Sequence, residues 1–269
     1  MMGYNSPMIS PQTKTVFTFT AAVGLMLLVV TAAAALDEFD ELQEQALAAL
    51  EAGEIAAALE YYTAMHELDP QNGEVAYNRG SLLIDLGRYS EAVRVLSVAI
   101  DLGEETLNAY FNRAIALAAE DDPHRALEDL ERALELDGNS SPVFNNKGVI
   151  LSRLDRNDEA FEAFLAAREA DAAYAEPRFH LGNMLYDREE LELAEQLFTE
   201  ALEIAPEFEQ AQFNRGNARY LMGQYTGAIE DFMSLLSLRP DDPDVLVNLG
   251  LAALAHAEAL ESDGEREDQ

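Results

Sequence analysis

Near the end of the chain, residues 209–242 read EQAQFNRGNARYLMGQYTGAIEDFMSLLSLRPDD. Apolar residues recur at helical spacing in two runs of this stretch, and the polar break GQY at 223–225 separates them. The first run carries FNRG at 213–216, the second carries Ala228 and Phe232, and Pro240 closes the unit. The stretch therefore predicts two amphipathic helices joined by a short turn.

The same pattern recurs along the chain with a constant step of 34 residues. The equivalents of FNRG are YNRG at 77–80, FNRA at 111–114, NNKG at 145–148, FHLG at 179–182 and VNLG at 247–250. An alanine keeps the same step and is followed four residues later by a large apolar residue; the alanines are Ala58, Ala92, Ala126, Ala160, Ala194 and Ala228. Small residues let two helices approach closely, and the large residue one turn later fills the space. Such a hairpin cannot bury its apolar face alone, so we expect the hairpins to stack.

This joint pattern resembles the tetratricopeptide repeat, which couples a Leu-Gly pair, an Ala-x-x-x-Phe and a closing Pro within about 34 residues. The resemblance implies an all-α fold, a right-handed superhelical solenoid of helix-turn-helix repeats over 37–262. The repeats are expected at 39–72, 73–106, 107–140, 141–174, 175–208 and 209–242. A capping helix over 243–262 and a disordered acidic tail over 263–269 are expected to follow. Repeats two to four depart from the pattern, because Glu104, Gly138 and Ala172 replace the closing Pro.

The composition excludes several classes of function. The chain has 269 residues, of which 51 are acidic and 17 basic, and its formal net charge is −34. Such a surface repels phosphate backbones, so we expect no nucleic-acid binding. The absence of cysteine excludes disulfides, thiolate metal sites and cysteine nucleophiles. The four histidines lie far apart in sequence, so we expect no metal site and no cofactor.

The first 36 residues differ from the rest. Residues 16–36 are uncharged and mostly apolar, with Lys14 before them and Asp37 after them. The apolar run 23–30 has the length of a signal-peptide core, and TAAAA at 31–35 offers overlapping cleavage sites. The whole stretch, at about 20 residues, is also long enough to cross a bilayer as an anchor. We therefore predict that residues 1–36 are a signal peptide or a membrane anchor. The repeats would then be exported (periplasmic or extracellular) or held on the non-cytoplasmic side.

The resemblance also points to a groove lined by the first helix of each repeat, helix A. In the family, positions two, five, six, nine and twelve face this groove. Position six carries mostly asparagines here, which can both donate to and accept from a peptide unit: Asn78, Asn112, Asn146, His180, Asn214 and Asn248. Asn183 and Asn217 would widen this ladder, and four aromatic residues stand beside it: Tyr77, Phe111, Phe179 and Phe213. The same amides can instead join neighbouring helices, so a ligand-binding role and a structural role both stay open.

The function implied by the resemblance is a non-catalytic scaffold that binds a peptide or partner protein in the concave groove. The alternative is a structural subunit that docks a basic partner through its acidic convex face. Cations follow the asparagines directly at Arg79, Arg113, Lys147 and Arg215, and we expect them to pair with nearby acids. Carboxylates are numerous but belong to solvated helix surfaces, and no glycine-rich phosphate loop occurs, so we predict no enzymatic activity.

Overall fold

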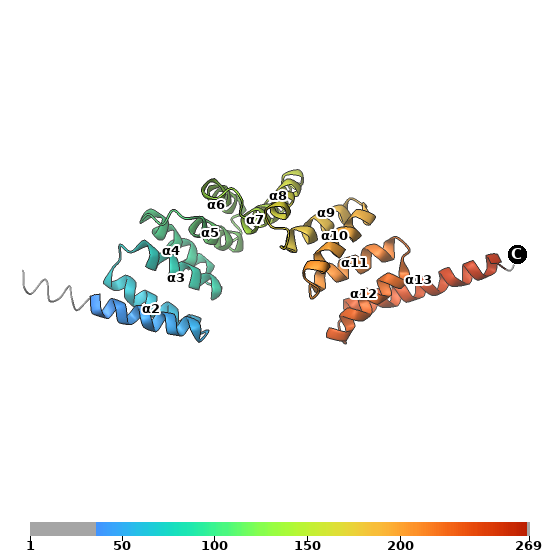
Figure 1. The fold of residues 1–269 in the computed structure, drawn as a ribbon, viewed down its shortest axis with the longest axis horizontal. Coiled ribbons are helices and arrows are strands. Elements are labelled where there is room, and N and C mark those ends of the chain that lie inside the picture. The colour runs from blue at the N-terminus through green and yellow to red at the C-terminus, as the bar shows by residue number, and fades with distance from the viewer. Residues whose placement is uncertain (1–35, 268–269) are drawn as a thin grey trace, which may run out of the picture. The chain divides into compact units, whose positions relative to one another are not determined.

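The computed structural model describes residues 36–267, which form helices and short turns and contain no strand (Figure 1). The predicted signal peptide or anchor therefore lies outside the described residues, apart from residue 36. The described stretch opens with a helix over 36–51. The helices that follow are α2 (Ile55–Leu68), α3 (Gly73–Asp85), α4 (Tyr89–Asp101), α5 (Leu107–Ala119), α6 (Pro123–Leu136), α7 (Ser141–Arg153), α8 (Asn157–Ala170), α9 (Glu176–Asp187), α10 (Leu191–Ile204), α11 (Glu209–Leu221), α12 (Tyr225–Leu238) and α13 (Pro243–Glu267).

The helices belong to two compact units, one ending at Glu105 and the other beginning at Thr106. This division falls inside residues 37–262, for which the sequence predicts one solenoid. In the first unit α3 packs against α2 and α4. In the second unit α5–α6, α7–α8, α9–α10 and α11–α12 form hairpins, and each hairpin packs against the next. The all-α hairpin architecture predicted from the sequence is thus confirmed.

The core of each hairpin follows the repeated small and large residues. The alanines of the second helix, helix B, are fully buried from Ala58 to Ala228. Glycine in helix A faces the large residue of helix B, and a Cβ atom at Gly216 would lie 2.7 Å from the Phe232 ring. Gly148 stands in the same relation to Phe164. A larger side chain at these glycines would therefore push the two helices of a hairpin apart.

The turn inside each hairpin uses left-handed backbone at one fixed position. The residues at this position have φ between 57° and 75°: Gly53, Gly87, Asp121, Asp155, Glu189 and Gly223. Glycine adopts this conformation without a steric cost, whereas a residue with a Cβ atom is strained there. Half of the turns therefore use a residue that suits the backbone poorly.

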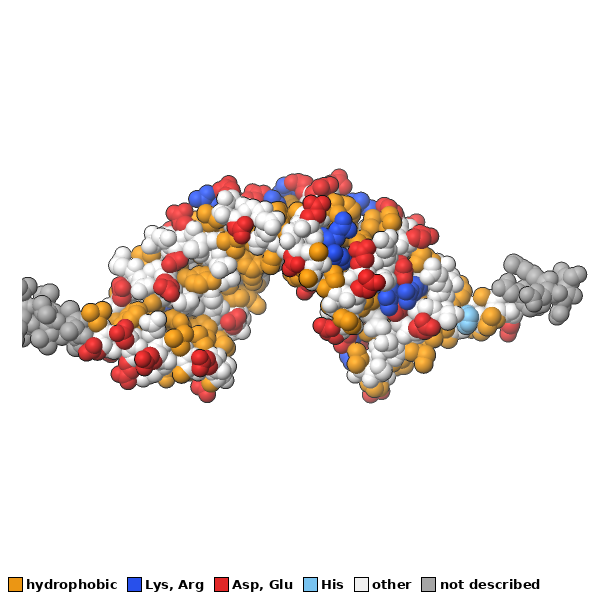
Figure 2. Space-filling model, viewed as in Figure 1, with side chains coloured by type: hydrophobic (Ala, Val, Ile, Leu, Met, Phe, Trp, Pro, Cys, Tyr) orange, Lys and Arg blue, Asp and Glu red, His pale blue; other side chains and the backbone are white. Residues whose placement is uncertain are grey.

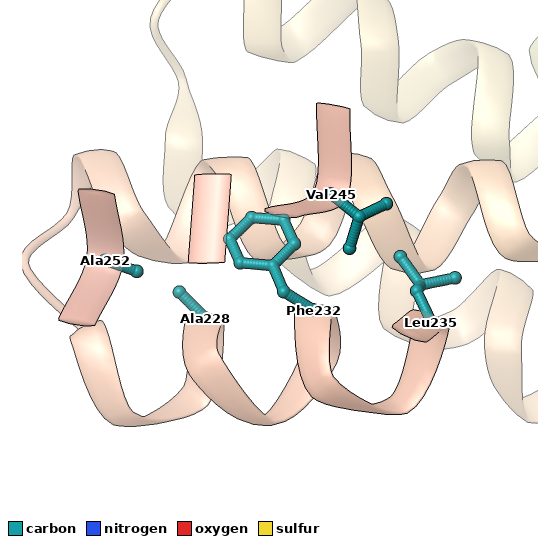
Figure 3. Close-up of a cluster of buried hydrophobic side chains, with 5 residues drawn as sticks. All are labelled: Ala228, Phe232, Leu235, Val245 and Ala252. Atoms are coloured by element: carbon teal, nitrogen blue, oxygen red, sulfur yellow. The ribbon is translucent and has the colours of Figure 1, made fainter. Parts of the chain in front are cut away.

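Helix α13 covers the last hairpin, as predicted. Val245 and Ala252 of α13 are buried against Ala228, Phe232 and Leu235 of α12 (Figure 3). The predicted end of this helix was wrong, because α13 continues past residue 262 to Glu267. The acidic tail is rich in glutamate, a good helix former, and adding residues to an existing helix avoids the cost of a new nucleus. Residues 268–269 lie outside the described part.

Within residues 36–267, no helix combines the length and the apolar character that crossing a membrane requires. Carboxylate side chains are spread over the visible surface of both units and outnumber the cations (Figure 2). Several cations lie beside carboxylates at the start of a helix B, as Arg88 does beside Glu91 at 2.7 Å. Exposed pairs of this kind add little stability.

Candidate functional site

A hollow of about 550 Å³ opens in the second unit where α9, α11 and the start of α13 come together. Its lining comes from three consecutive A-type helices and from the turns that lead into α11 and α13. The lining residues are Phe179, Glu207, Glu209, Gln210, Phe213, Asn214, Arg239, Asp242, Asp244 and Val245. Three of them, Phe179, Phe213 and Asn214, are predicted groove residues. The helical repeat explains why they meet, since residues 34 positions apart occupy the same face of successive A helices.

The two phenylalanines that line the hollow pack against other aromatic rings. The Phe213 ring lies edge-on to the buried Phe232 ring of α12, with 5.9 Å between centroids. The Phe179 ring lies 4.9 Å from that of Phe208, which precedes α11. Phe179 and Phe213 are themselves only half-buried. They therefore offer apolar surface that rigid neighbours hold in place.

The rim of the hollow is acidic. Arg239 bridges two of its carboxylates, with Nη2 at 2.6 Å from Glu209 Oε2 and Nη1 at 3.2 Å from Asp242 Oδ2. Asp242 also caps α13, because its Oδ1 accepts from the Val245 N–H at 3.3 Å. In the described part of the chain, the side chains of Glu207 and Asp244 form no ion pair. The lining thus holds four carboxylates and one cation.

Two pairs of asparagines join neighbouring A helices. Asn214 Nδ2 donates to Asn183 Oδ1 at 2.7 Å, and Asn248 Nδ2 donates to Asn217 Oδ1 at 3.2 Å. Each bond connects two residues that are 31 positions apart. An asparagine amide has two N–H groups and one oxygen. In each pair, the side-chain oxygen of the donating asparagine and the two N–H groups of the accepting asparagine therefore take no part in the bond. The ladder therefore has a structural role in these helices and retains groups that can meet a ligand.

The other predicted ladder residues have different environments. Asn146 Nδ2 donates to Pro142 O of its own helix at 2.9 Å. The His180 ring stacks on Phe164 of α8, with centroids 4.7 Å apart and planes 18° apart. Burial lowers the pKa of His180 to about 4, so the ring is neutral near pH 7. His180 thus packs between hairpins and does not line the hollow.

Four further predicted residues are not part of the lining of the hollow. Tyr77 and Asn78 belong to α3 in the first unit, while Phe111 and Asn112 belong to α5 in the second. All four are half-buried. Of the predicted set, only Phe179, Phe213 and Asn214 line this hollow.

Three of the four cations that follow the asparagines pair with acids in helix B, as expected, whereas Arg79 Nε is buried without a hydrogen-bond partner among the described residues. Arg113 Nε and Nη2 each donate to Asp129 at 2.7 Å, and Arg215 holds Asp231 in the same way. Asp129 and Asp231 are 6% and 3% exposed. Lys147 Nζ lies 3.3 Å from Glu131 Oε1. These pairs stabilise the fold. Their cations are already bound to carboxylates and are therefore not available to an anionic ligand.

A second hollow, of about 620 Å³, lies against α7 and α8 and is lined by Phe144, Phe161 and Ala163 among others. Its cations, Lys147 and Arg188, are already paired with acids of α6 and α8. No predicted groove residue lines it. The hollow at α9, α11 and α13 is therefore the candidate site.

Several lining residues are not among those predicted from the sequence. Glu207, Arg239 and Asp242 stand in the turns between repeats, whereas the predicted groove positions all lie along helix A. Gln210 and Asp244 are at position two of their repeats, which the family resemblance implies to be a groove position. A count of charges at position two and in the preceding turn would have predicted an acidic rim.

Comparison with protein families gives four matches along the chain. Models described as tetratricopeptide repeat match residues 49–110, 107–140 and 145–207, and a model described as TPR repeat matches residues 216–256. The chain belongs to the tetratricopeptide repeat family. The matches follow one another through both units. A comparison with curated protein sequences gives no match.

Several solved structures share the fold of this tetratricopeptide repeat chain. YrrB, described as a TPR protein with an unusual peptide-binding site, is 26% identical, with a TM-score of 0.53 over 62% of this chain and 86% of YrrB. A tetratricopeptide repeat protein from Parabacteroides merdae is 19% identical, with a TM-score of 0.66 over 82% of this chain and 88% of that protein. PilF of Pseudomonas aeruginosa is 15% identical, with a TM-score of 0.67 over 80% of this chain and 96% of PilF. The last two likenesses show the fold alone.

Proposed function

We propose that the chain is a non-catalytic interaction scaffold and that the hollow at α9, α11 and α13 binds an extended, basic segment of a partner protein. The observation that carries this proposal is the combination of half-buried Phe179 and Phe213 with an acidic rim in one hollow. Apolar side chains of the segment would pack on the two rings. Its lysines or arginines would lie near Glu207 and Asp244.

The polar groups of the hollow suit a peptide backbone. Asn214 uses one N–H in its bond to Asn183, and its side-chain oxygen remains to accept from a peptide N–H. Gln210, one turn before Asn214 on the same face, adds a second amide. Backbone contacts of this kind hold a chain without selecting its side chains, so the selection would come from the acidic rim.

The lining supports binding better than catalysis. It contains no serine, threonine, cysteine, lysine or histidine, so it offers no nucleophile with an adjacent base. The peptide-binding site of YrrB, which is 26% identical, supports the same class of function. The uncharged segment 16–36 further supports an exported or anchored scaffold, which N-terminal sequencing of the native protein would test.

The test uses a blocked nine-residue peptide of alternating lysine and leucine, with a matched peptide of alternating glutamate and leucine as its control. We expect the lysine peptide to bind, as measured by calorimetry, and the glutamate peptide not to bind. Asn214→Ala should weaken binding about fivefold, because one net hydrogen bond contributes about 1 kcal/mol. Glu207→Gln with Asp244→Asn should weaken binding further and reduce its dependence on salt.

A control variant separates the hollow from the rest of the acidic surface. Glu192→Gln removes an exposed carboxylate from α10, which does not line the hollow. The proposal expects this variant to bind the lysine peptide as the unchanged protein does. An equal loss of affinity in Glu192→Gln and in the rim variant would contradict binding in the hollow. It would support the alternative, in which a basic partner docks on the acidic surface outside the hollow.

A further inference from the structure

Gly250 of α13 is the one glycine of its series that no helix covers within the described residues. In the complete hairpins this glycine of helix A faces a large side chain of helix B sixteen residues later. A Cβ atom would lie 2.5 Å from Leu96 at Gly80, 2.5 Å from Phe164 at Gly148, 2.6 Å from Phe198 at Gly182 and 2.7 Å from Phe232 at Gly216. At Gly250 nothing lies within 4 Å. Helix α13 is therefore a helix A without its helix B.

The face of α13 around Gly250 is apolar and exposed. Residues three or four positions from a helical residue share its face. On this face Leu246 is 46% exposed, Val247 61% and Leu254 59%, and Ala253 is also exposed. The opposite face of α13 is already used, because Val245 and Ala252 pack on α12 (Figure 3). The exposed face is thus a second surface of the same helix.

The chain does not fold back to cover this face in the described residues. The position sixteen residues after Gly250 is Arg266, and it lies on α13 itself, which runs without a turn to Glu267. Because residues 250 and 266 share one straight helix, residue 266 cannot lie opposite residue 250. Within residues 36–267, no segment of the chain therefore covers this face.

We propose that α13 docks an amphipathic helix of a partner protein, in the way that each helix A of this chain docks its own helix B. The partner helix would carry a small residue and, four residues later, a Phe or Leu that sits over Gly250, as Ala228 and Phe232 do in α12. Its flanks would be basic, because Asp244, Glu258 and Glu261 are exposed along α13 and the chain carries a net charge of −34. The same charge disfavours a second copy of the chain as the occupant.

The probe is a peptide built on α12, residues 225–238, with Glu230→Lys and Asp231→Lys and with two Ala-Lys pairs added at each end. We expect it to bind the full chain and to become helical on binding, as seen by calorimetry and circular dichroism. The same peptide with Phe232→Ala should bind at least tenfold more weakly, since the ring that occupies the site over Gly250 is lost.

Gly250→Leu in the protein tests whether the Phe ring of the peptide binds over Gly250. Nothing lies within 4 Å of this glycine and its backbone is helical, so the variant should fold at least as well as the unchanged protein. We expect it to bind the Phe peptide at least tenfold more weakly. The Ala peptide should bind it no more weakly than it binds the unchanged protein. Non-specific hydrophobic binding predicts the reverse, because Gly250→Leu adds exposed apolar surface.

Two further variants complete the test. Leu254→Ser removes an apolar side chain from the proposed face, and Leu193→Ser removes one that is 50% exposed on α10. Only Leu254→Ser should weaken binding, and Glu207→Gln, in the other hollow, should have no effect. Undiminished binding of the Phe peptide by Gly250→Leu would overturn the proposal. So would a dimer in sedimentation that Leu254→Ser dissociates, because a second copy would then be the occupant.

Discussion

Asp231 of α12 is almost fully buried, and Arg215 of α11 reaches it across the hairpin with Nη2 at 2.6 Å from Oδ1. Arg219, one turn later on α11, donates to the other oxygen of the same carboxylate at 3.0 Å. In α5–α6, Arg113 and Asp129 form the equivalent pair, and Arg113 donates to both carboxylate oxygens at 2.7 Å. In each of these two hairpins, a buried carboxylate that accepts two hydrogen bonds from arginine thus holds the two helices together.

Arg113→Met should destabilise the protein strongly. It leaves Asp129, which is 6% exposed, without the arginine that satisfies both of its oxygens. Removing one partner of a buried ion pair typically costs about 3–5 kcal/mol. Arg113→Met with Asp129→Ala should recover much of this loss, because no buried charge is then left unpaired. Arg88→Met, which breaks the exposed pair with Glu91, should cost less than about 1 kcal/mol. Urea unfolding of the three variants measures these differences, and equal losses in Arg113→Met and Arg88→Met would contradict the argument.

The stability of the second unit should fall as the pH decreases from about 6.5 to about 4, because of His180. Burial lowers its pKa from 6.5 to about 4, so the folded chain keeps the ring neutral where the unfolded chain protonates it. The unfolded state then binds more protons between these two pH values, and the free energy of unfolding decreases on acidification. The stabilisation is complete above pH 6.5 and amounts to at most about 3 kcal/mol.

The measurement is urea unfolding at several pH values between 4 and 7, compared with His180→Asn. Asparagine is the residue at this position in several other repeats and does not titrate in this range. The difference in unfolding free energy between the two proteins should change with pH, in favour of the variant at low pH. Carboxylates titrate in both proteins, so their contribution cancels. A difference that stays constant from pH 7 to pH 4 would show that His180 is not protonated on unfolding.

The fold could be predicted from the sequence because the hairpin is a local structure repeated at fixed intervals. Ala228, Phe232 and Gly216 each have a contact that follows from sequence spacing alone, and the structure places all three as expected. The end of α13 could not be predicted in this way. No proline interrupts the glutamate-rich tail, and its polar composition predicts disorder although it is also compatible with a helix.

The candidate site was predicted less completely, since it depends on how side chains of different repeats meet. The spacing placed Asn183 and Asn214 on adjacent A helices, but it could not tell whether they would bond each other or a ligand. His180 occupies the same register as the asparagines, yet its ring found an aromatic partner, Phe164, in the preceding hairpin. Arg239 lines the site from a turn, where the repeat pattern does not predict the direction of a side chain.

The melting temperature should rise with added sodium chloride. A net charge of −34 on a chain of 269 residues makes the folded state repel itself, and salt screens this repulsion over roughly 10 Å at 0.1 M. Salt also weakens exposed ion pairs such as Arg156–Glu159, but each contributes only about 0–1 kcal/mol. The gain from screening should therefore exceed this loss. Thermal unfolding between low and molar salt measures the trend, and a flat or falling curve would sink the prediction.

Glu189→Gly should stabilise the protein. Glu189 has φ at 62° in the turn between α9 and α10, and Gly223 occupies the same place, at 75°, in the next hairpin. A left-handed conformation costs a residue with a Cβ atom about 1–2 kcal/mol, and the extra freedom of glycine in the unfolded chain offsets about 0.5–1 kcal/mol of the relief. The expected net gain is about 0.5–1 kcal/mol in the free energy of unfolding.

The neighbouring residue supplies the control. Glu190 has φ at −85°, outside the left-handed region, so Glu190→Gly relieves no strain and should destabilise the chain. Asp121→Gly should gain less than Glu189→Gly, because Asp121 Oδ1 also accepts from Arg153 Nη2 at 2.8 Å. Urea unfolding should therefore rank the variants with Glu189→Gly first, Asp121→Gly second and Glu190→Gly last. If Glu189→Gly and Glu190→Gly lower stability equally, left-handed strain does not limit these turns.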